Sequence, residues 1–303
     1  MIELANVRKR FGSRVAVDDL SLQVPAGEIF GLLGHNGAGK STAIGMMLGQ
    51  VWPTSGEVKV CGHDVTRHRA LALHKVGAIF ESPAFYDYLS GWKNLEILSH
   101  YTAPTSKERI REVVDWVGLT GRENSKVKTY SHGMRARLAL AQTLLPQPEL
   151  LILDEPGGGL DPEGIAEMRQ TILRLHRELG LTILLSSHLL TEVEQLCSRI
   201  AVLNKGCKVF EGSVADIKTA RSRVALRTPD FAAATGLLLE RGLIVGTQAG
   251  EFITLKDSTT TADVARGLVT AGIAVDGIWQ REQTLEDFYL DLIKVPPIPK
   301  SQN

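Results

Sequence analysis

The residues best suited to chemistry form one glycine-rich stretch, Gly34-His35-Asn36-Gly37-Ala38-Gly39-Lys40-Ser41-Thr42. The stretch fits the pattern G-x-x-x-x-G-K-[ST], whose backbone N–H groups close around phosphate oxygens at a helix N-terminus. In this pattern Lys40 neutralises the β- and γ-phosphates, and Ser41 holds Mg²⁺. The alternative is a tight glycine turn that only caps a buried helix.

The flanking residues supply the elements that this phosphate loop needs. The apolar run Ile29 to Leu33 predicts a short strand before it. Lys40 to Leu48 predicts a helix after it, which ends near Gly49. A strand, a loop and a helix in this order favour phosphate binding over a simple turn.

A second acidic site follows the apolar run Leu150 to Leu153, which ends in Asp154-Glu155-Pro156. Parallel α/β sheets bind ligands at the carboxyl ends of their strands, where these two carboxylates would lie. Asp154 is predicted to bind Mg²⁺, and Glu155 to polarise the attacking water. An ordinary strand that ends in an acidic turn is the alternative, and the phosphate loop weighs against it.

The rest of the pattern alternates strands and helices. A helix is expected over 162–179 and a strand over 181–185, so that strand, helix and strand repeat; this favours an α/β fold with a parallel sheet. Two short strands are expected over 15–19 and 21–27. Helices over 105–117 and 135–145 predict a helical middle of the chain.

The C-terminal part has a different texture, which resembles a split βαβ unit. The expected elements are strand 223–227, helix 231–241, strands 243–247 and 252–255, helix 262–271, strand 274–280 and a final helix 285–293. We therefore expect a large domain over 1–213 with a helical subdomain over about 82–146, and a small α+β accessory domain over 214–294. The proline-rich tail 295–303 is expected to be mobile.

The composition of the chain argues against several classes of protein. The chain has 303 residues, and its 34 basic residues balance 34 acidic ones, so charge gives no reason to expect binding to nucleic acid. Its apolar stretches are far shorter than the roughly 20 residues of a membrane-spanning helix. The N-terminus shows no secretory signal, and Cys61, Cys197 and Cys207 are scattered. A cytosolic protein is expected.

A further motif lies between the phosphate loop and the acidic site. It is here called the signature segment and reads Tyr130-Ser131-His132-Gly133-Met134-Arg135-Ala136-Arg137-Leu138-Ala139-Leu140-Ala141. It resembles the L-S-G-G-Q signature of ATP-binding-cassette (ABC) proteins. Leu160-Asp161-Pro162, Ser186-Ser187-His188 and Phe11 extend the resemblance. The six motifs follow the order of that family over about residues 1–213.

The resemblance implies the P-loop NTPase fold of an ABC ATPase with a helical subdomain, and ATP and Mg²⁺ as cofactors. By analogy, Phe11 would stack on adenine, His188 would contact the γ-phosphate, and Asp161 would lie at a dimer contact. Ser131 and Gly133 would complete the phosphate site of a second copy, so that a homodimer clamps two ATP molecules. The catalytic residues would be Lys40, Glu155 and His188.

Three departures from the family pattern are visible. Glu81 stands where most members have Gln, and with the following Pro83-Ala84-Phe85-Tyr86 it resembles the bacitracin-resistance and lantibiotic-immunity exporters. Glu81 can still bind Mg²⁺ or water through oxygen. His132 replaces the first glycine of the signature, and Gly157-Gly158-Gly159 stands where Thr-x-Gly is common.

The resemblance therefore implies the ATPase subunit of an exporter, held at the cytoplasmic face of the membrane by a separate integral-membrane permease. The closing segment 284–290 looks like the accessory domain of export-type subunits, which helps to hold the dimer. The aromatic residues Phe85, Tyr86, Tyr88 and Trp92 are either a core patch or a groove for the permease. Two other functions stay open: a soluble cassette ATPase that acts on ribosomes or DNA, and a cassette that binds nucleotide without hydrolysis.

Overall fold

The computed structural model describes residues 1–80, 84–102, 105–220, 223–248, 251–281 and 284–294. These residues separate into two compact units, Met1–Val214 and residues 215–294. Glu81 lies outside the described residues. Within them, no helix is both long and apolar enough to cross a membrane.

The first unit opens with an antiparallel sheet in the order β2-β1-β4-β5. Its strands are β1 (Ile2–Phe11), β2 (Arg14–Val24), β4 (Ser55–Val60) and β5 (His63–Asp64). The prediction of two strands over 15–19 and 21–27 was wrong, because a single strand, β2, runs unbroken from Arg14 to Val24. Asp19 takes a left-handed φ of 50° inside the strand and accepts a hydrogen bond of 2.9 Å from Asn6 Nδ2. A β-bulge therefore replaces the expected turn.

The second sheet has six strands in the order β10-β9-β3-β8-β7-β6. Its strands are β3 (Ile29–Leu33), β6 (Val76–Ile79), β7 (Leu150–Asp154), β8 (Thr182–Ser187), β9 (Arg199–Asn204) and β10 (Cys207–Ser213). All neighbours pair in parallel except β10, which closes one edge antiparallel to β9. The predicted parallel α/β core is confirmed.

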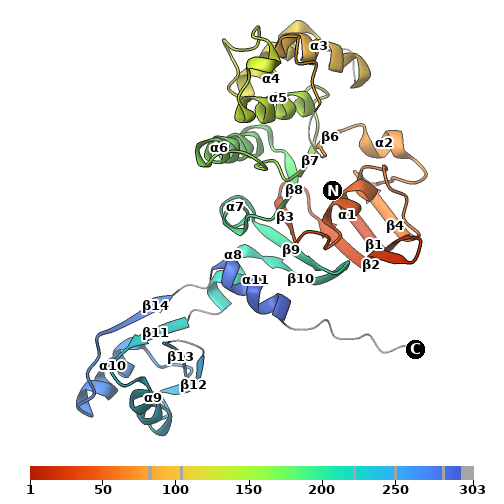
Figure 1. Cartoon of the computed structure of the whole chain (residues 1–303). Helices are drawn as coiled ribbons and strands as arrows, with labels where there is room; N and C mark the ends of the chain where they lie inside the picture. The colour runs from red at the N-terminus through yellow and green to blue at the C-terminus, as the bar shows by residue number, and fades with distance from the viewer. Residues whose placement is uncertain (81–83, 103–104, 221–222, 249–250, 282–283, 295–303) are drawn as a thin grey trace. The chain divides into compact units, whose positions relative to one another are not determined.

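The helices of this core are α1 (Lys40–Met47), α2 (Arg69–Leu73), α6 (Pro162–Leu179) and α7 (Leu190–Leu196). One apolar cluster joins the antiparallel sheet, α1 and the parallel sheet through residues such as Leu22, Ile44 and Ile152. The predicted bounds of α6 are confirmed, since Asp161 caps its N-terminus and Gly180 ends it with a left-handed φ of 65°. Figure 1 shows these elements around the sheets.

The helical part of the first unit consists of α3 (Gly91–Thr102), α4 (Lys107–Trp116), a 3₁₀ turn at Val127–Thr129 and α5 (His132–Leu144). α5 begins earlier than the predicted residue 135, because the Ser131 hydroxyl accepts a hydrogen bond of 3.2 Å from Met134 N and caps the helix there. The Arg174 guanidinium of α6 lies 4.6 Å from the ring centroid of Trp116 and joins α4 to the core.

The second unit is an antiparallel sheet with two helices packed on it. It contains β11 (Arg223–Arg227), α9 (Phe231–Glu240), β12 (Ile244–Gln248), β13 (Phe252–Leu255), α10 (Thr261–Thr270) and β14 (Gly277–Arg281), flanked by α8 (Val214–Ala220) and α11 (Leu285–Lys294). The strand order β12-β13-β11-β14 is that of a split βαβ unit, as the sequence predicts. Its own apolar core includes Leu226, Leu238 and Leu268.

A substitution at Gly77 of β6 tests how closely α5 of the helical part packs on the parallel sheet. A Cβ at this position would lie 2.4 Å from the Thr143 carbonyl oxygen of α5. We expect Gly77→Ala to lower the free energy of unfolding by about 1–3 kcal/mol, because neither backbone can give way cheaply. Denaturant titration of the variant and of the parent chain measures this difference in the free energy of unfolding.

Gly236→Ala is the control, since a methyl group there would meet no atom within 4 Å. Alanine at this exposed helical position should stabilise the protein by about 0.5–1 kcal/mol. Equal effects of the two substitutions would contradict the packing described for Gly77.

Candidate active site

The phosphate loop connects the fully buried strand β3 to α1. Gly34, Gly37 and Gly39 have φ values of 155°, 82° and 106°, which favour glycine. A Cβ on Gly34 would lie 2.6 Å from the Leu203 carbonyl oxygen, and one on Gly39 would lie 2.7 Å from the Ala16 carbonyl oxygen. The loop therefore needs glycine both for its conformation and for its close approach to neighbouring strands.

Lys40 is held inside this loop. Its side chain is only 5% exposed, and its ammonium group donates a hydrogen bond of 2.7 Å to the Gly34 carbonyl oxygen. A positive charge thus lies where the N–H groups of the loop and of α1 would receive an anion. His35 fastens the loop to the end of β9, with Nε2 3.2 Å from Asn204 Oδ1, a contact that sequence reasoning missed.

The two predicted carboxylates lie at the end of β7. Asp154 is its last residue, and Glu155 follows with a left-handed φ of 51°. Ser186 of the neighbouring strand β8 fixes both: its hydroxyl donates to Asp154 Oδ1, and Glu155 N–H donates to the Ser186 carbonyl oxygen and hydroxyl, each at 3.1 Å. A non-glycine residue with this φ needs such support.

His188 joins the carboxylates from the loop after β8. Its Nδ1 lies 3.0 Å from Glu155 Oε2, within hydrogen-bond distance. The structure thus pairs two residues that the sequence proposed for separate roles. A carboxylate next to an imidazole can take a proton from water while the imidazole fixes its orientation.

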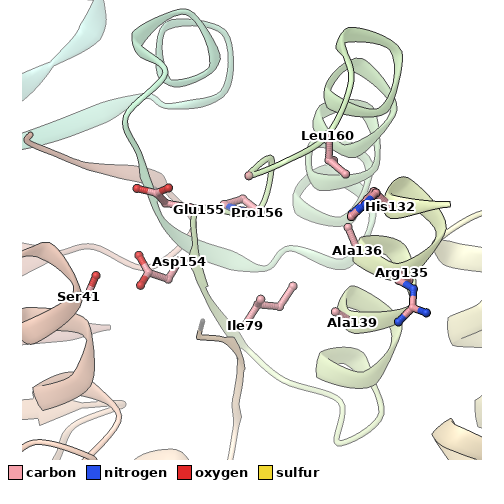
Figure 2. Close-up of a pocket in the computed structure, with 11 residues that line it drawn as sticks. Ser41, Ile79, His132, Arg135, Ala136, Ala139, Asp154, Glu155, Pro156 and Leu160 are labelled. Carbon is pink, nitrogen blue, oxygen red and sulfur yellow. The ribbon is translucent and has the colours of Figure 1, made fainter. Parts of the chain in front are cut away.

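A cavity of about 540 Å³ opens beside the two carboxylates Asp154 and Glu155. Figure 2 shows Ser41 beside Asp154 on one side and His132, Ala136 and Ala139 of α5 on the other. The cavity therefore brings together the predicted metal ligands Ser41 and Asp154 with the predicted base Glu155. It is lined by Ser41, Ile79, His132, Arg135, Ala136, Ala139, Asp154, Glu155, Pro156, Gly158 and Leu160.

Ser131, Gly133 and Asp161 are not among the residues that line this cavity. They line a second cavity of about 560 Å³ at the N-termini of α5 and α6. Asp161 also has a structural part there, since its Oδ1 accepts a hydrogen bond of 2.9 Å from Gly164 N. His132 lines both cavities and so stands at the boundary between them.

Phe11 is also not among the residues that line the first cavity. Its side chain, at the end of β1, is 52% exposed, as a stacking platform must be. The Lys9 ammonium lies 4.8 Å from the centroid of the ring. Tyr86 and Tyr88 are exposed as well and meet edge to face, with centroids 6.1 Å apart, so they belong to a surface patch and not to a buried core.

The comparisons with known proteins agree with these motifs. Residues 17–158 match the family described as ABC transporter. The chain is 36% identical over 301 residues to the bacitracin transport ATP-binding protein BcrA of Enterococcus faecalis, covering 97% of this chain and 96% of that one. The chain belongs to the ABC transporter family.

Two further relatives and one solved structure are also similar to this ABC cassette. It is 51% identical over 206 residues to the uncharacterized ABC transporter ATP-binding protein YhcH of Bacillus subtilis, covering 68% of each chain. It is 35% identical over 301 residues to the daunorubicin resistance ATP-binding protein DrrA3 of Streptomyces coeruleorubidus, covering 96% of this chain and 95% of that one. Among solved structures, a dimeric bacterial ABC transporter cassette matches with a TM-score of 0.64 and 26% identity, covering 71% of this chain and 99% of that one. The predicted ABC ATPase fold is confirmed.

The proposed adenine platform of this cassette can be tested at Phe11. Base stacking on an aromatic side chain contributes about 1–3 kcal/mol, so Phe11→Ala should weaken ATP binding by that amount. Phe11→Tyr should keep it. Titration with a fluorescent ATP analogue measures both.

Tyr101→Ala serves as the control, because Tyr101 is a still more exposed aromatic residue on α3. We expect it to bind ATP as the parent chain does. Unchanged affinity in Phe11→Ala would remove Phe11 from the nucleotide site.

Proposed function

We propose that this cassette is the ATP-binding and ATP-hydrolysing subunit of an exporter, which drives transport through a separate integral-membrane permease at the cytoplasmic face of the membrane. The observation that carries the hydrolytic part is the Glu155–His188 pair at 3.0 Å, in which Glu155 shares a cavity with Asp154 and with Ser41 of the phosphate loop. Each of the groups required for phosphoryl transfer to water has a candidate within the first unit.

The residues present fit a Mg²⁺–ATP substrate. Magnesium prefers oxygen ligands, keeps several waters and needs only one or two protein side chains, which Ser41 and Asp154 can supply from one cavity. When bound, the ion would neutralise phosphate charge. Lys40 would bind the β- and γ-phosphates, Glu155 would take the proton of the attacking water, and His188 would orient Glu155 and reach the γ-phosphate.

A homodimer explains why the signature residues lie in a separate cavity. Ser131 and Gly133 do not line the cavity of Ser41 and Asp154. In the proposed dimer they contact the phosphates bound to a second copy, so that two ATP molecules are held between two chains. The match to a dimeric cassette supports this arrangement. We also propose that the second unit, as an accessory domain over about 214–294, helps to hold the dimer.

Export is supported by the names of relatives that match nearly the full chain, which include bacitracin transport and daunorubicin resistance ATP-binding proteins. We assign the exposed patch of Tyr86 and Tyr88 as the contact with the permease. It lies in the segment that joins β6 to α3, and the Asp87 carboxylate pairs with Arg135 of the signature segment at 2.8 Å. Movement of the signature segment would thus reach the patch directly.

Replacement of the proposed base tests hydrolysis. Glu155→Gln should bind ATP as the parent does and hydrolyse it at least about 100-fold more slowly, because a positioned base contributes that much to the rate. It should also accumulate as an ATP-bound dimer in size-exclusion chromatography. Parent-like turnover in this variant would refute the assignment of Glu155.

Coupling to a permease is tested by ATPase assays on the tagged chain, alone and in the complex recovered from membranes after crosslinking. We expect the permease to stimulate hydrolysis, and a Tyr86→Ala and Tyr88→Ala double variant to lose that stimulation while its basal rate stays unchanged. Tyr101→Ala is the matched control. Turnover that is indifferent to any membrane protein would favour a soluble cassette ATPase instead.

A further inference from the structure

Glu192 is a buried carboxylate close to the catalytic pair. It lies in the first turn of α7 and is only 7% exposed. Burial, and after it the Glu192 carboxylate, raises the pKa of the neighbouring Cys197 thiol, so that this thiol adds no second negative charge beside Glu192. A buried carboxylate needs hydrogen bonds to offset its lost hydration. The contacts of its two carboxylate oxygens therefore indicate what Glu192 does in the fold.

One carboxylate oxygen is bound by the residue that precedes His188. The Ser187 hydroxyl donates to Glu192 Oε2 at 2.8 Å. The same hydroxyl accepts a hydrogen bond of 3.0 Å from Leu189 N, on the other side of His188. The backbone on both sides of His188 is therefore held by one hydroxyl, and Glu192 fixes that hydroxyl.

The other carboxylate oxygen rests on the turn that follows Glu155. A Cβ on Gly157 would lie 2.3 Å from Glu192 Oε1 and 3.2 Å from its Cδ. Real Cβ contacts are never this short, so the carboxylate occupies the place of a side chain at residue 157. A methyl group at residue 157 would therefore have to displace the Glu192 carboxylate from this position.

Glu192 thus touches both segments that carry the catalytic pair. We propose that Glu192 is the positioning residue that sets the contact between Glu155 and His188 by bridging the Gly157 backbone and the Ser187 hydroxyl. The inference rests on the proposed hydrolysis of ATP. Because Glu192 lines neither cavity, its loss should slow the chemical step and leave ATP binding intact.

A double-variant cycle on the full chain tests the bridge. Gly157→Ala should push the carboxylate away and lower kcat about tenfold, within the range for coupled neighbours, with KM for ATP unchanged. Glu192→Asp retracts the carboxylate and should lower kcat by a similar factor. The combined variant should be no slower than Glu192→Asp alone, because the shorter side chain leaves room for the methyl group.

Thermal unfolding and titration with a fluorescent ATP analogue accompany each assay, so that a loss of fold or of binding is distinguished from a loss of positioning. Ser187→Ala provides a second route if Gly157→Ala does not fold, and it should lower kcat with KM unchanged. Glu194→Gln removes a carboxylate from the same helix and should keep parent turnover.

Losses that multiply in the combined variant, or parent kcat in Glu192→Asp and Ser187→Ala, would overturn the bridge while the proposed function stands. Absence of ATP hydrolysis by the parent chain itself would overturn the proposed function and the bridge together.

Discussion

The site depends on the packing of β8 between β3 and β7. These strands pair in parallel, so that Leu33 lies opposite Ser187 and Asp154 opposite Ser186. Their carboxyl ends therefore deliver the phosphate loop, the carboxylates and the serines that hold them to one edge of the sheet. All of β8 is buried. Apolar packing in the sheet thus fixes the distances on which the chemistry relies.

The candidate site contains groups whose backbone conformation or burial lowers the local stability of the fold. Glu155 holds a left-handed backbone, a conformation that costs a residue with a side chain about 1–3 kcal/mol. Lys40 and Glu192 keep charged groups largely out of water. Each is compensated by specific partners: Ser186 for Glu155, the Gly34 carbonyl oxygen for Lys40, and the Ser187 hydroxyl for Glu192. Substitution of one of these partners should therefore change the position of the proposed catalytic groups.

Much of this could be predicted because it is local in the sequence. The phosphate loop follows from glycines between an apolar run and a helix, and α6 from the capping residue Asp161 and the stop at Gly180. The bulge in β2 could not be predicted, since it depends on Asn6 of another strand. The same holds for Ser186 and Glu192, whose contacts join distant segments: a serine at a strand end and a glutamate in a helix are ordinary in sequence. Glu81 lies outside the described residues, and its role stays a prediction.

The proposed Glu192 bridge would also allow dimer formation to affect the positions of Glu155 and His188. Asp161, which lines the second cavity with Ser131 and Gly133, is joined to Glu155 by the glycine turn 157–159. A second copy that binds at that cavity would press on this turn. Since Glu192 rests against the backbone of Gly157, pressure on the turn would reach Ser187 and with it His188. Closure of the proposed dimer would then align Glu155 with His188. ATP would be hydrolysed only after the two chains have closed.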